Sequence, residues 1–156
     1  MTDTATEKAP DAPKKTVSIF GLYEVDTDLQ ETGKWFKDVM ADGKGVDLKL
    51  RRVSSKYASR IRIELDKQYA DHLDKNGQYT NEDIAIDVLC KHLGTGVVAD
   101  WRGPMFVNED GSPMPYSADV AVVLMTRIPD LRARILQLSM DLENFRLHAQ
   151  KATEKN

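Results

Sequence analysis

The chain has 156 residues, of which 41% are hydrophobic and 30% charged, and its formal net charge at pH 7 is −3. This composition is that of a globular protein and excludes wholesale disorder, while the acidic excess predicts no general attraction to DNA or anionic membranes. The sequence has no apolar run of 18 residues and no signal-peptide block at its start, and its lone cysteine, Cys90, cannot form an internal disulfide. We therefore expect a soluble, cytoplasmic protein.

The two ends of the chain differ in composition from the part between them. Residues 1–15 are small, charged and proline-containing, with no large apolar side chain after Met1, and they predict a disordered N-terminal arm. Residues 151–156 predict a disordered tail for the same reason. The span 16–150 has no internal repeat and no Gly/Ser linker, so we expect it to form a single α+β domain.

The first half of this span has strand patterns. Residues 17–23 are β-branched and aromatic and predict a short strand, and alternation over residues 34–40 and 46–53 predicts two more. The segment between them, residues 41–45, has the glycines of a tight turn, so 34–53 should form an antiparallel hairpin. Its inward-facing side chains would be Val46, Leu48 and Leu50.

Two helices are predicted next. After the candidate N-cap Ser54-Ser55, apolar residues recur every fourth position and predict a helix ending at Asn76-Gly77. Thr80, followed by acidic residues that suit the first turn of a helix, opens the second one, which closes at Gly94. The apolar stripe of the first helix consists of Tyr57, Ile61, Leu65, Tyr69 and Leu73.

The remaining elements are a strand, a loop and two helices. Residues 97–101 read as a strand, and three prolines with an Asn-Glu-Asp-Gly turn make 103–115 a loop or irregular hairpin. Ser117 would cap a short helix to about Met125, and Pro129 would open a last helix to about Ala149. The expected fold is thus a small antiparallel sheet of three to five strands packed with four helices, the C-terminal one long.

The last helix has the clearest periodicity in the chain. Its apolar residues recur at alternating spacings of three and four, and twenty residues would make a rod of about 30 Å. This seam either packs on the protein's own core or is partly exposed and forms a surface for a partner or for self-association. The candidate partner-binding residues are Leu131, Ile135, Leu138, Leu142 and Phe145.

The sequence contains no recognisable catalytic or cofactor motif. Cys90 and His92 are two residues apart on a predicted helix, so their side chains would point to different faces. Asp83 and Asp87 are expected to lie on a solvated helix face. The Gly94-Thr95-Gly96 segment lacks the third glycine of a dinucleotide fingerprint and follows a helix, so we interpret its glycines as a helix end. We expect a non-enzymatic protein with no catalytic residues, no metal and no cofactor.

Basic residues concentrate near the second predicted strand and the helix that follows it. Such a cluster could dock a nucleic acid or an acidic partner. No aromatic residue interleaves with the basic residues of the strand, so base stacking is weakly supported and a protein-facing or solvated patch is favoured. The patch consists of Lys49, Arg51, Arg52, Arg60 and Arg62.

Six short motifs follow one another along residues 33–146. They are Gly33-Lys34-Trp35, Lys49-Leu50-Arg51-Arg52, Asp100-Trp101-Arg102-Gly103, Asp110-Gly111, Pro115-Tyr116-Ser117 and Asn144-Phe145-Arg146. In the order and spacing of these motifs the sequence resembles the tail assembly chaperones of long-tailed bacteriophages. We expect fold-determining roles for five of these residues, as a core anchor, turn glycines, a packing aromatic and a helix cap: Trp101, Gly103, Gly111, Tyr116 and Ser117.

The resemblance implies a non-catalytic function in the cytoplasm of an infected host. Such chaperones bind the long, helical tape measure protein, keep its apolar surfaces from aggregating, and help recruit tail tube subunits. A permanent tail or connector subunit of the virion is the alternative, followed by a small nucleic-acid-binding protein. The expected partners are therefore the tape measure protein and the tail tube protein, with possible self-association and no membrane.

Overall fold

The three strands form one antiparallel sheet in the order β1-β2-β3. The computed structural model describes residues 18–40 and 45–147, so the predicted arm 1–15 and tail 151–156 lie outside the described residues. The strands are β1 (Lys34–Phe36), β2 (Asp47–Leu50) and β3 (Val98–Arg102). The predicted α+β class is confirmed, with more helix than expected. The α-helices are α1 (Ile19–Tyr23), α2 (Thr27–Thr32), α3 (Lys56–Gln68), α4 (Glu82–Lys91), α5 (Ala118–Arg127) and α6 (Pro129–Met140).

The hairpin predicted over residues 34–53 is confirmed in its pairing. Lys34 lies opposite Leu50 and Phe36 opposite Leu48. Leu48 and Leu50 are buried, as the alternation predicted, and Trp101 of β3 lies opposite Leu48. The other face of the sheet is mixed in character, with Lys49 paired to both Trp35 and Asp100. One face of this small sheet therefore contributes to the core.

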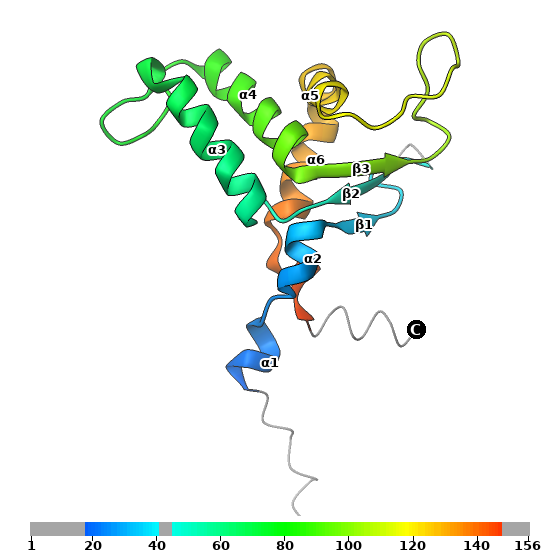
Figure 1. The fold of residues 1–156 in the computed structure, drawn as a ribbon, viewed down its shortest axis with the longest axis horizontal. Coiled ribbons are helices and arrows are strands. Elements are labelled where there is room, and N and C mark those ends of the chain that lie inside the picture. Colours follow the sequence, from blue (N-terminus) through cyan, green and yellow to red (C-terminus); the bar gives the residue numbers. More distant parts are fainter. Residues whose placement is uncertain (1–17, 41–44, 148–156) are drawn as a thin grey trace, which may run out of the picture.

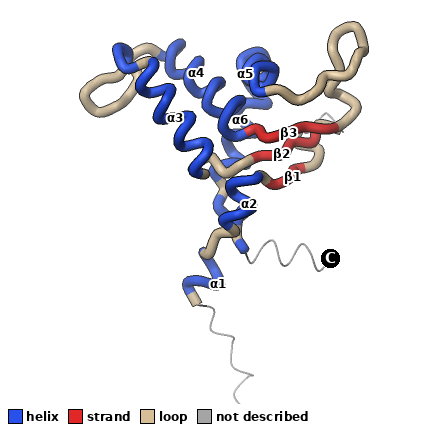
Figure 2. The backbone as a smooth tube through the Cα atoms, in the orientation of Figure 1, coloured by secondary structure: helices blue, strands red, loops and turns tan. Residues whose placement is uncertain are grey.

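Helices α3 and α4 lie at one end of the sheet, and the loop between β3 and α5 projects at the other (Figures 1 and 2). Ser55 caps α3, as predicted, by accepting a hydrogen bond from the Ala58 amide. The helix ends at Gln68, well before the predicted end at Asn76-Gly77. A 3₁₀ turn, Ala70–His72 (η1), follows it. The stripe residue Leu73 instead pairs with Tyr79 in an isolated bridge, and Asn81 caps α4.

The glycines after α4 do not end a helix. The chain continues without a break into the π-helical turn His92–Val97 (η2), which contacts α3, α4, α5, α6 and β3. A Cβ on Gly94 would lie 2.7 Å from the amide nitrogen of Val122 in α5, and one on Gly96 would lie 3.1 Å from Cα of Ala58 in α3. These glycines are therefore needed for close packing of backbones around the turn.

The strand predicted over residues 17–23 is wrong, because the described part of this segment is helix α1. Ser18 accepts a hydrogen bond from the Gly21 amide and caps the helix. The helix projects from the body beyond α2, and none of its residues is buried (Figure 1). Its β-branched and aromatic residues favour a strand only where a neighbouring strand is available to pair, and the described part of the chain places no strand beside it.

The last helix is shorter than predicted. Helix α6 begins at Pro129 as expected but ends at Met140, and a 3₁₀ turn, Leu142–Phe145 (η3), follows. Asp141 breaks the helix because its backbone is extended and its carboxylate accepts a hydrogen bond from the Glu143 amide, a local alternative to helix. The 12 residues of α6 span about 18 Å, so the predicted rod of 30 Å does not form.

The segment after α6 closes the core next to the first strand. Phe145 is fully buried and packs edge-on to Phe36, with ring centroids 6.3 Å apart. Its carbonyl accepts a hydrogen bond from the Asp26 amide, and Val25 pairs with Arg146 in an isolated bridge. The connection between α1 and α2 is thereby fixed to the C-terminal segment.

Candidate functional site

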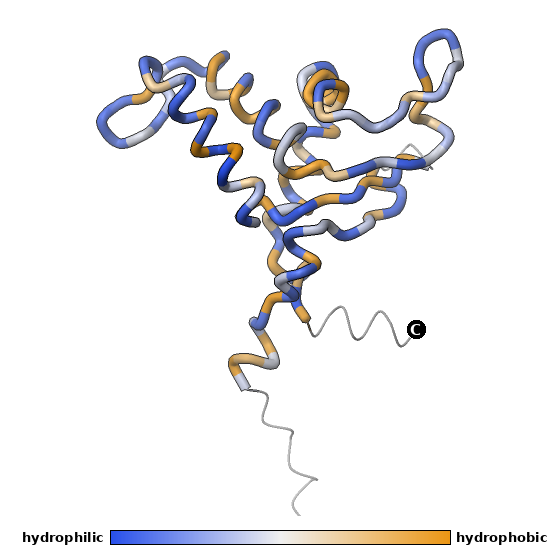
Figure 3. Tube along the Cα trace, in the orientation of Figure 1, coloured by the Kyte–Doolittle hydropathy of each residue, from blue (hydrophilic) through white to orange (hydrophobic). Residues whose placement is uncertain are grey.

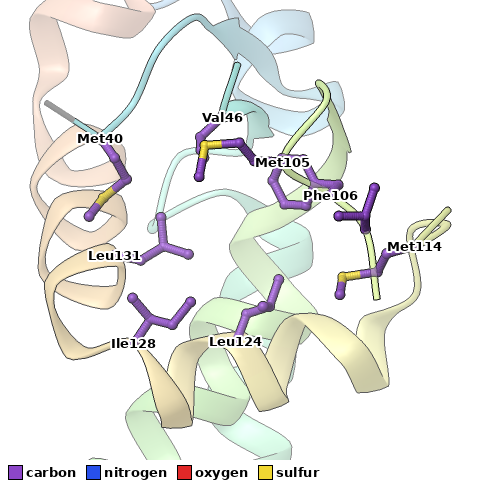
Figure 4. A pocket seen from close by; sticks show the side chains of 9 residues that line it. Met40, Val46, Met105, Phe106, Met114, Leu124, Ile128 and Leu131 are labelled. Carbon is purple, nitrogen blue, oxygen red and sulfur yellow. The ribbon is translucent and has the colours of Figure 1, made fainter. Parts of the chain in front are cut away.

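An open apolar groove of about 440 Å³ lies beside the start of α6 (Figure 4). Four separate parts of the chain form its walls: the end of α5, the start of α6, the loop after β3, and the described hairpin residues on either side of 41–44. Every lining side chain is apolar. The lining residues are Met40, Val46, Met105, Phe106, Val107, Met114, Leu124, Ile128 and Leu131.

The loop wall of the groove is held in place by Trp101. The Trp101 ring stacks on Phe106 with centroids 5.1 Å apart and meets Tyr116 edge-on at 5.0 Å. Its Nε1–H donates a 2.8 Å hydrogen bond to the carbonyl of Met114. Both arms of the loop are thus attached to a single buried side chain, and this fixes the positions of two groove residues, Phe106 and Met114.

The other four residues expected to determine the fold support the same loop. Gly103 has a φ of +127°, and a Cβ there would lie 1.7 Å from the carbonyl oxygen of Gly45. Gly111 has a φ of +84° in the turn at the tip of the loop. The Tyr116 hydroxyl donates to the carbonyl of Val98, and burial raises the pKa of this phenol above its usual value, which keeps it a donor. Ser117 caps α5 through the Val120 amide.

The groove combines a buried floor with exposed edges. Val46 and Leu131 are buried, whereas Met105 is 56% exposed and Val107 and Ile128 are both near 40%. Three of the nine lining residues are methionines, whose flexible and polarisable side chains adapt to irregular apolar partners. The labelled side chains point toward a common space (Figure 4). Such a surface can bind apolar side chains without a demanding shape match.

The seam predicted on the last helix is mostly internal. Leu131, Ile135 and Phe145 are buried, and Leu138 and Leu142 are partly buried. In this conformation the first three cannot form an exposed docking surface, because they complete the protein's own core. Leu131 alone of the five also lines the groove. The sequence pattern thus identified one residue of the groove floor, and it missed the walls contributed by the loop and the hairpin.

Most residues of the predicted basic patch interact with groups close to them in the fold. Arg51 donates to the carbonyls of Glu31 and Gly96 and lies over the Tyr57 ring. Arg52 donates to Gln30, and Arg62 forms a 3.0 Å ion pair with Asp66. Lys49 lies on the sheet between its two cross-strand neighbours, and Arg60 is exposed on α3. Most of these cations are committed to positioning their own neighbours, so the patch offers little free charge for phosphate binding.

The thiol of Cys90 and the imidazole of His92 both lie in the core. Cys90 is buried, as expected for a small apolar residue, with its Sγ 3.5 Å from a guanidinium nitrogen of Arg132. His92 is buried, and its Nε2–H donates to the carbonyl of Ala58, 3.0 Å away. Desolvation lowers the pKa of this imidazole below its ordinary value of 6.5, and the charge of Arg62 lowers it further. Among the described residues, no three of the His, Cys, Asp and Glu side chains group together to hold a metal.

A network of polar side chains links the end of α3 to α4. The Tyr69 hydroxyl donates to Asp87, Lys91 forms an ion pair with the same carboxylate at 3.2 Å, and Lys91 also donates to Tyr69. The Tyr79 hydroxyl donates to Asp66, and burial together with this bond raises its pKa to about 12. The contacts among Tyr69, Asp87 and Lys91 hold α4 to the end of α3, whereas the Tyr79–Asp66 bond holds the segment between the two helices against α3.

No helix within the described ranges has both the length and the apolar character needed to cross a bilayer. Together, the fold and the groove define a small α+β protein with an open, methionine-rich apolar surface. The chain belongs to the YdaY prophage protein family, whose sequence model matches residues 52–156, about two thirds of the chain. It is therefore a phage-derived protein. No curated protein and no solved structure matches it significantly. The match includes all of the groove lining except Met40 and Val46.

Proposed function

We propose that this protein is a non-catalytic tail assembly chaperone that binds the tape measure protein in its apolar groove and promotes tail tube assembly in the cytoplasm of the infected cell. The observation that carries the proposal is the groove of nine apolar side chains, open to solvent and rich in methionine. Membership of a prophage protein family and the resemblance over residues 33–146 support the same assignment.

The groove has the size and chemistry to receive a helical client. A cavity of roughly 150 Å³ holds one benzene-sized ring, so about 440 Å³ accommodates two or three large apolar side chains. An amphipathic helix presents such side chains at spacings of three and four residues, and helix-in-groove binding uses these anchors. A long helical client offers many such segments, which adaptable methionines can bind in turn.

The test is co-expression with the tape measure protein encoded by the same prophage. We expect the wild-type chain to copurify with its client and to raise the soluble fraction of the client. Ile128→Glu places a charge in the groove and should abolish both effects, because a carboxylate there has to be desolvated when the client binds. Val123→Glu lies on α5, at a site 47% exposed and outside the groove, and should leave both effects unchanged.

Copurification that is equally strong with Ile128→Glu would contradict a role for the groove. Absence of any effect on the solubility or recovery of the client, with a correctly folded wild-type chain, would contradict the chaperone function itself. Circular dichroism and the urea midpoint of each variant establish that it is folded before binding is compared.

A permanent tail or connector subunit is the second candidate function. The exposed apolar helix α1 favours it, because a lasting subunit contact would bury such a surface. Mass spectrometry of purified particles separates the two functions, since a structural subunit is present in stoichiometric amounts and a chaperone is absent.

A further inference from the structure

Helix α1 is apolar on all sides and yet exposed. Its sequence is Ile-Phe-Gly-Leu-Tyr, and it has no buried residue. Phe20 is 72% exposed, Ile19 68%, Tyr23 53% and Leu22 41%. Figure 3 shows this segment largely in the apolar colours at the end of the molecule. A helix that is hydrophobic all round is normally buried, so α1 has the composition of an element with a partner.

The described part of the chain does not supply that partner. The Arg146 guanidinium lies over the Tyr23 ring, 5.0 Å from its centre. A five-residue helix is far below the length at which an isolated helix is stable in water. Its helical form therefore needs packing that the described residues of one copy do not provide.

We propose that α1 of one copy occupies the apolar groove of a second copy, and that the exchange is reciprocal, so that the free protein is a dimer whose two grooves are capped by its own sequence. This inference rests on the proposed function only in naming the client that would displace α1. The dimer itself stands on the two complementary apolar surfaces.

The chemistry of the two surfaces is complementary. The groove is lined by apolar side chains, with Met105 and Met114 on the loop and Ile128 between the two helices at its edge. Phe20 and Ile19, the most exposed side chains of α1, are an aromatic and an aliphatic group of the size that the groove holds. Contacts between methionine sulfur and an aromatic ring add to the apolar gain.

The position of α1 favours exchange between copies over closure within one copy. The helix projects below the sheet beyond α2, whereas the loop that walls the groove lies past the far end of β3 (Figure 1). The Val25–Arg146 bridge and the hydrogen bond from the Asp26 amide to Phe145 fix the base of α1 to the C-terminal segment. Reciprocal exchange therefore requires a two-fold arrangement in which α1 of each copy lies in the groove of the other.

The area to be buried also favours a reciprocal dimer. With roughly 200 Å² for each full side chain, the exposed fractions of its four apolar residues leave about 450 Å² of α1 surface open. One such helix in one groove falls well short of the 1,200–2,000 Å² of stable interfaces, because the groove receives only two or three large side chains. Two reciprocal contacts double the buried area and bring it close to the lower end of that range. A two-fold dimer is also the commonest closed assembly.

Sedimentation velocity on the full chain tests the dimer. Wild type should be dimeric, and both Phe20→Glu in α1 and Ile128→Glu in the groove should weaken dimerisation by about 100-fold or more, since each removes both reciprocal contacts. Met105→Glu, at a 56% exposed site, is a second groove variant in case Ile128→Glu is poorly folded. Ile63→Glu on α3, 53% exposed and outside the groove, is the matched control and should remain dimeric.

Mixing the two variants tests the exchange itself. Phe20→Glu keeps an intact groove and Ile128→Glu keeps an intact α1, so the mixture recovers one of the two contacts and should associate more strongly than either variant alone. A wild type that is monomeric at its highest soluble concentration overturns the inference. The inference is also overturned if Phe20→Glu loses the dimer while the groove variants remain dimeric. A monomeric wild type whose α1 binds phospholipid vesicles overturns it as well.

Client binding by Phe20→Glu separates this inference from the proposed function. Because its groove is intact and uncapped, this variant should bind the tape measure protein more tightly than concentrated wild type does. If Phe20→Glu is monomeric and binds no client, the dimer stands and the chaperone function fails. If wild type is monomeric and only the groove variants lose the client, the function stands and the dimer fails.

Discussion

Gly103 is the residue where backbone conformation and packing restrict the side chain most strongly. Its φ of +127° is one that L side chains rarely adopt, and the carbonyl oxygen of Gly45 occupies the place of a Cβ. The residue joins β3 to the loop that walls the groove. Its role is thus structural, and it acts on the groove through the position of the loop.

Gly103→Ala should lower the free energy of unfolding by about 3 kcal/mol or more, because the added carbon requires the backbone around Gly45 to move. Gly111→Ala is the control: its φ is also positive, but no atom lies within 4 Å of the added carbon. It should cost about 1 kcal/mol from strain alone. Urea denaturation measures both values, and equal losses would refute the close approach.

His92 should make stability depend on pH. Desolvation lowers the pKa of the folded imidazole below its ordinary value of 6.5, so its contribution is present above that value and is lost as the pH falls below it. The unfolded chain then binds a proton that the folded chain binds weakly. The urea midpoint of wild type should drop between about pH 7.5 and about pH 5.5.

His92→Gln should show a smaller drop over the same range, because the amide can still donate to Ala58 but does not titrate. The comparison between the two proteins isolates His92 from the carboxylates, which are common to both. An identical drop in both proteins would show that His92 is not the group responsible.

The turn η2 is the element on which the helices converge. A substitution Gly94→Ala brings two opposing effects: alanine favours helix by about 1 kcal/mol, whereas its Cβ would lie 2.7 Å from a backbone nitrogen of α5. Overpacking against backbone costs about 1–3 kcal/mol, so the clash should win. We expect a net loss of up to about 2 kcal/mol in urea denaturation, and a smaller loss for the neighbouring control Thr95→Ala. A stabilised Gly94→Ala would contradict the packing of α5 on this turn.

Elements with local signals were predictable from the sequence, and those set by tertiary contacts were not. The alternation of Leu48 and Leu50, the cap Ser55 and the start at Pro129 all depend on neighbouring residues, and the structure has them as expected. The end of α6 was missed because apolar residues at spacings of three and four fit a helix followed by a 3₁₀ turn as well as they fit one long helix.

At the scale of the molecule, the sequence predicted an apolar seam on the last helix, whereas the apolar groove of the structure is formed mostly by other elements. The groove combines Met40 and Val46 with a loop that follows some sixty residues later and with helix residues still further on. No local sequence pattern predicts that these distant segments meet, because their meeting depends on how the loop is attached to Trp101. Of the predicted seam, Leu131 alone reaches it.

The methionine methyl groups give the most direct test that the groove is the binding surface. The chain has six methionines, three of which line the groove, while Met125 is buried in the core and Met140 is exposed on α6. With methyl-labelled methionine, NMR spectra are recorded while a helical peptide of the tape measure protein is added. Binding in the groove should shift the signals of Met40, Met105 and Met114 and leave those of Met125 and Met140 unchanged. Binding that shifts Met140 and leaves the three groove signals in place would contradict it.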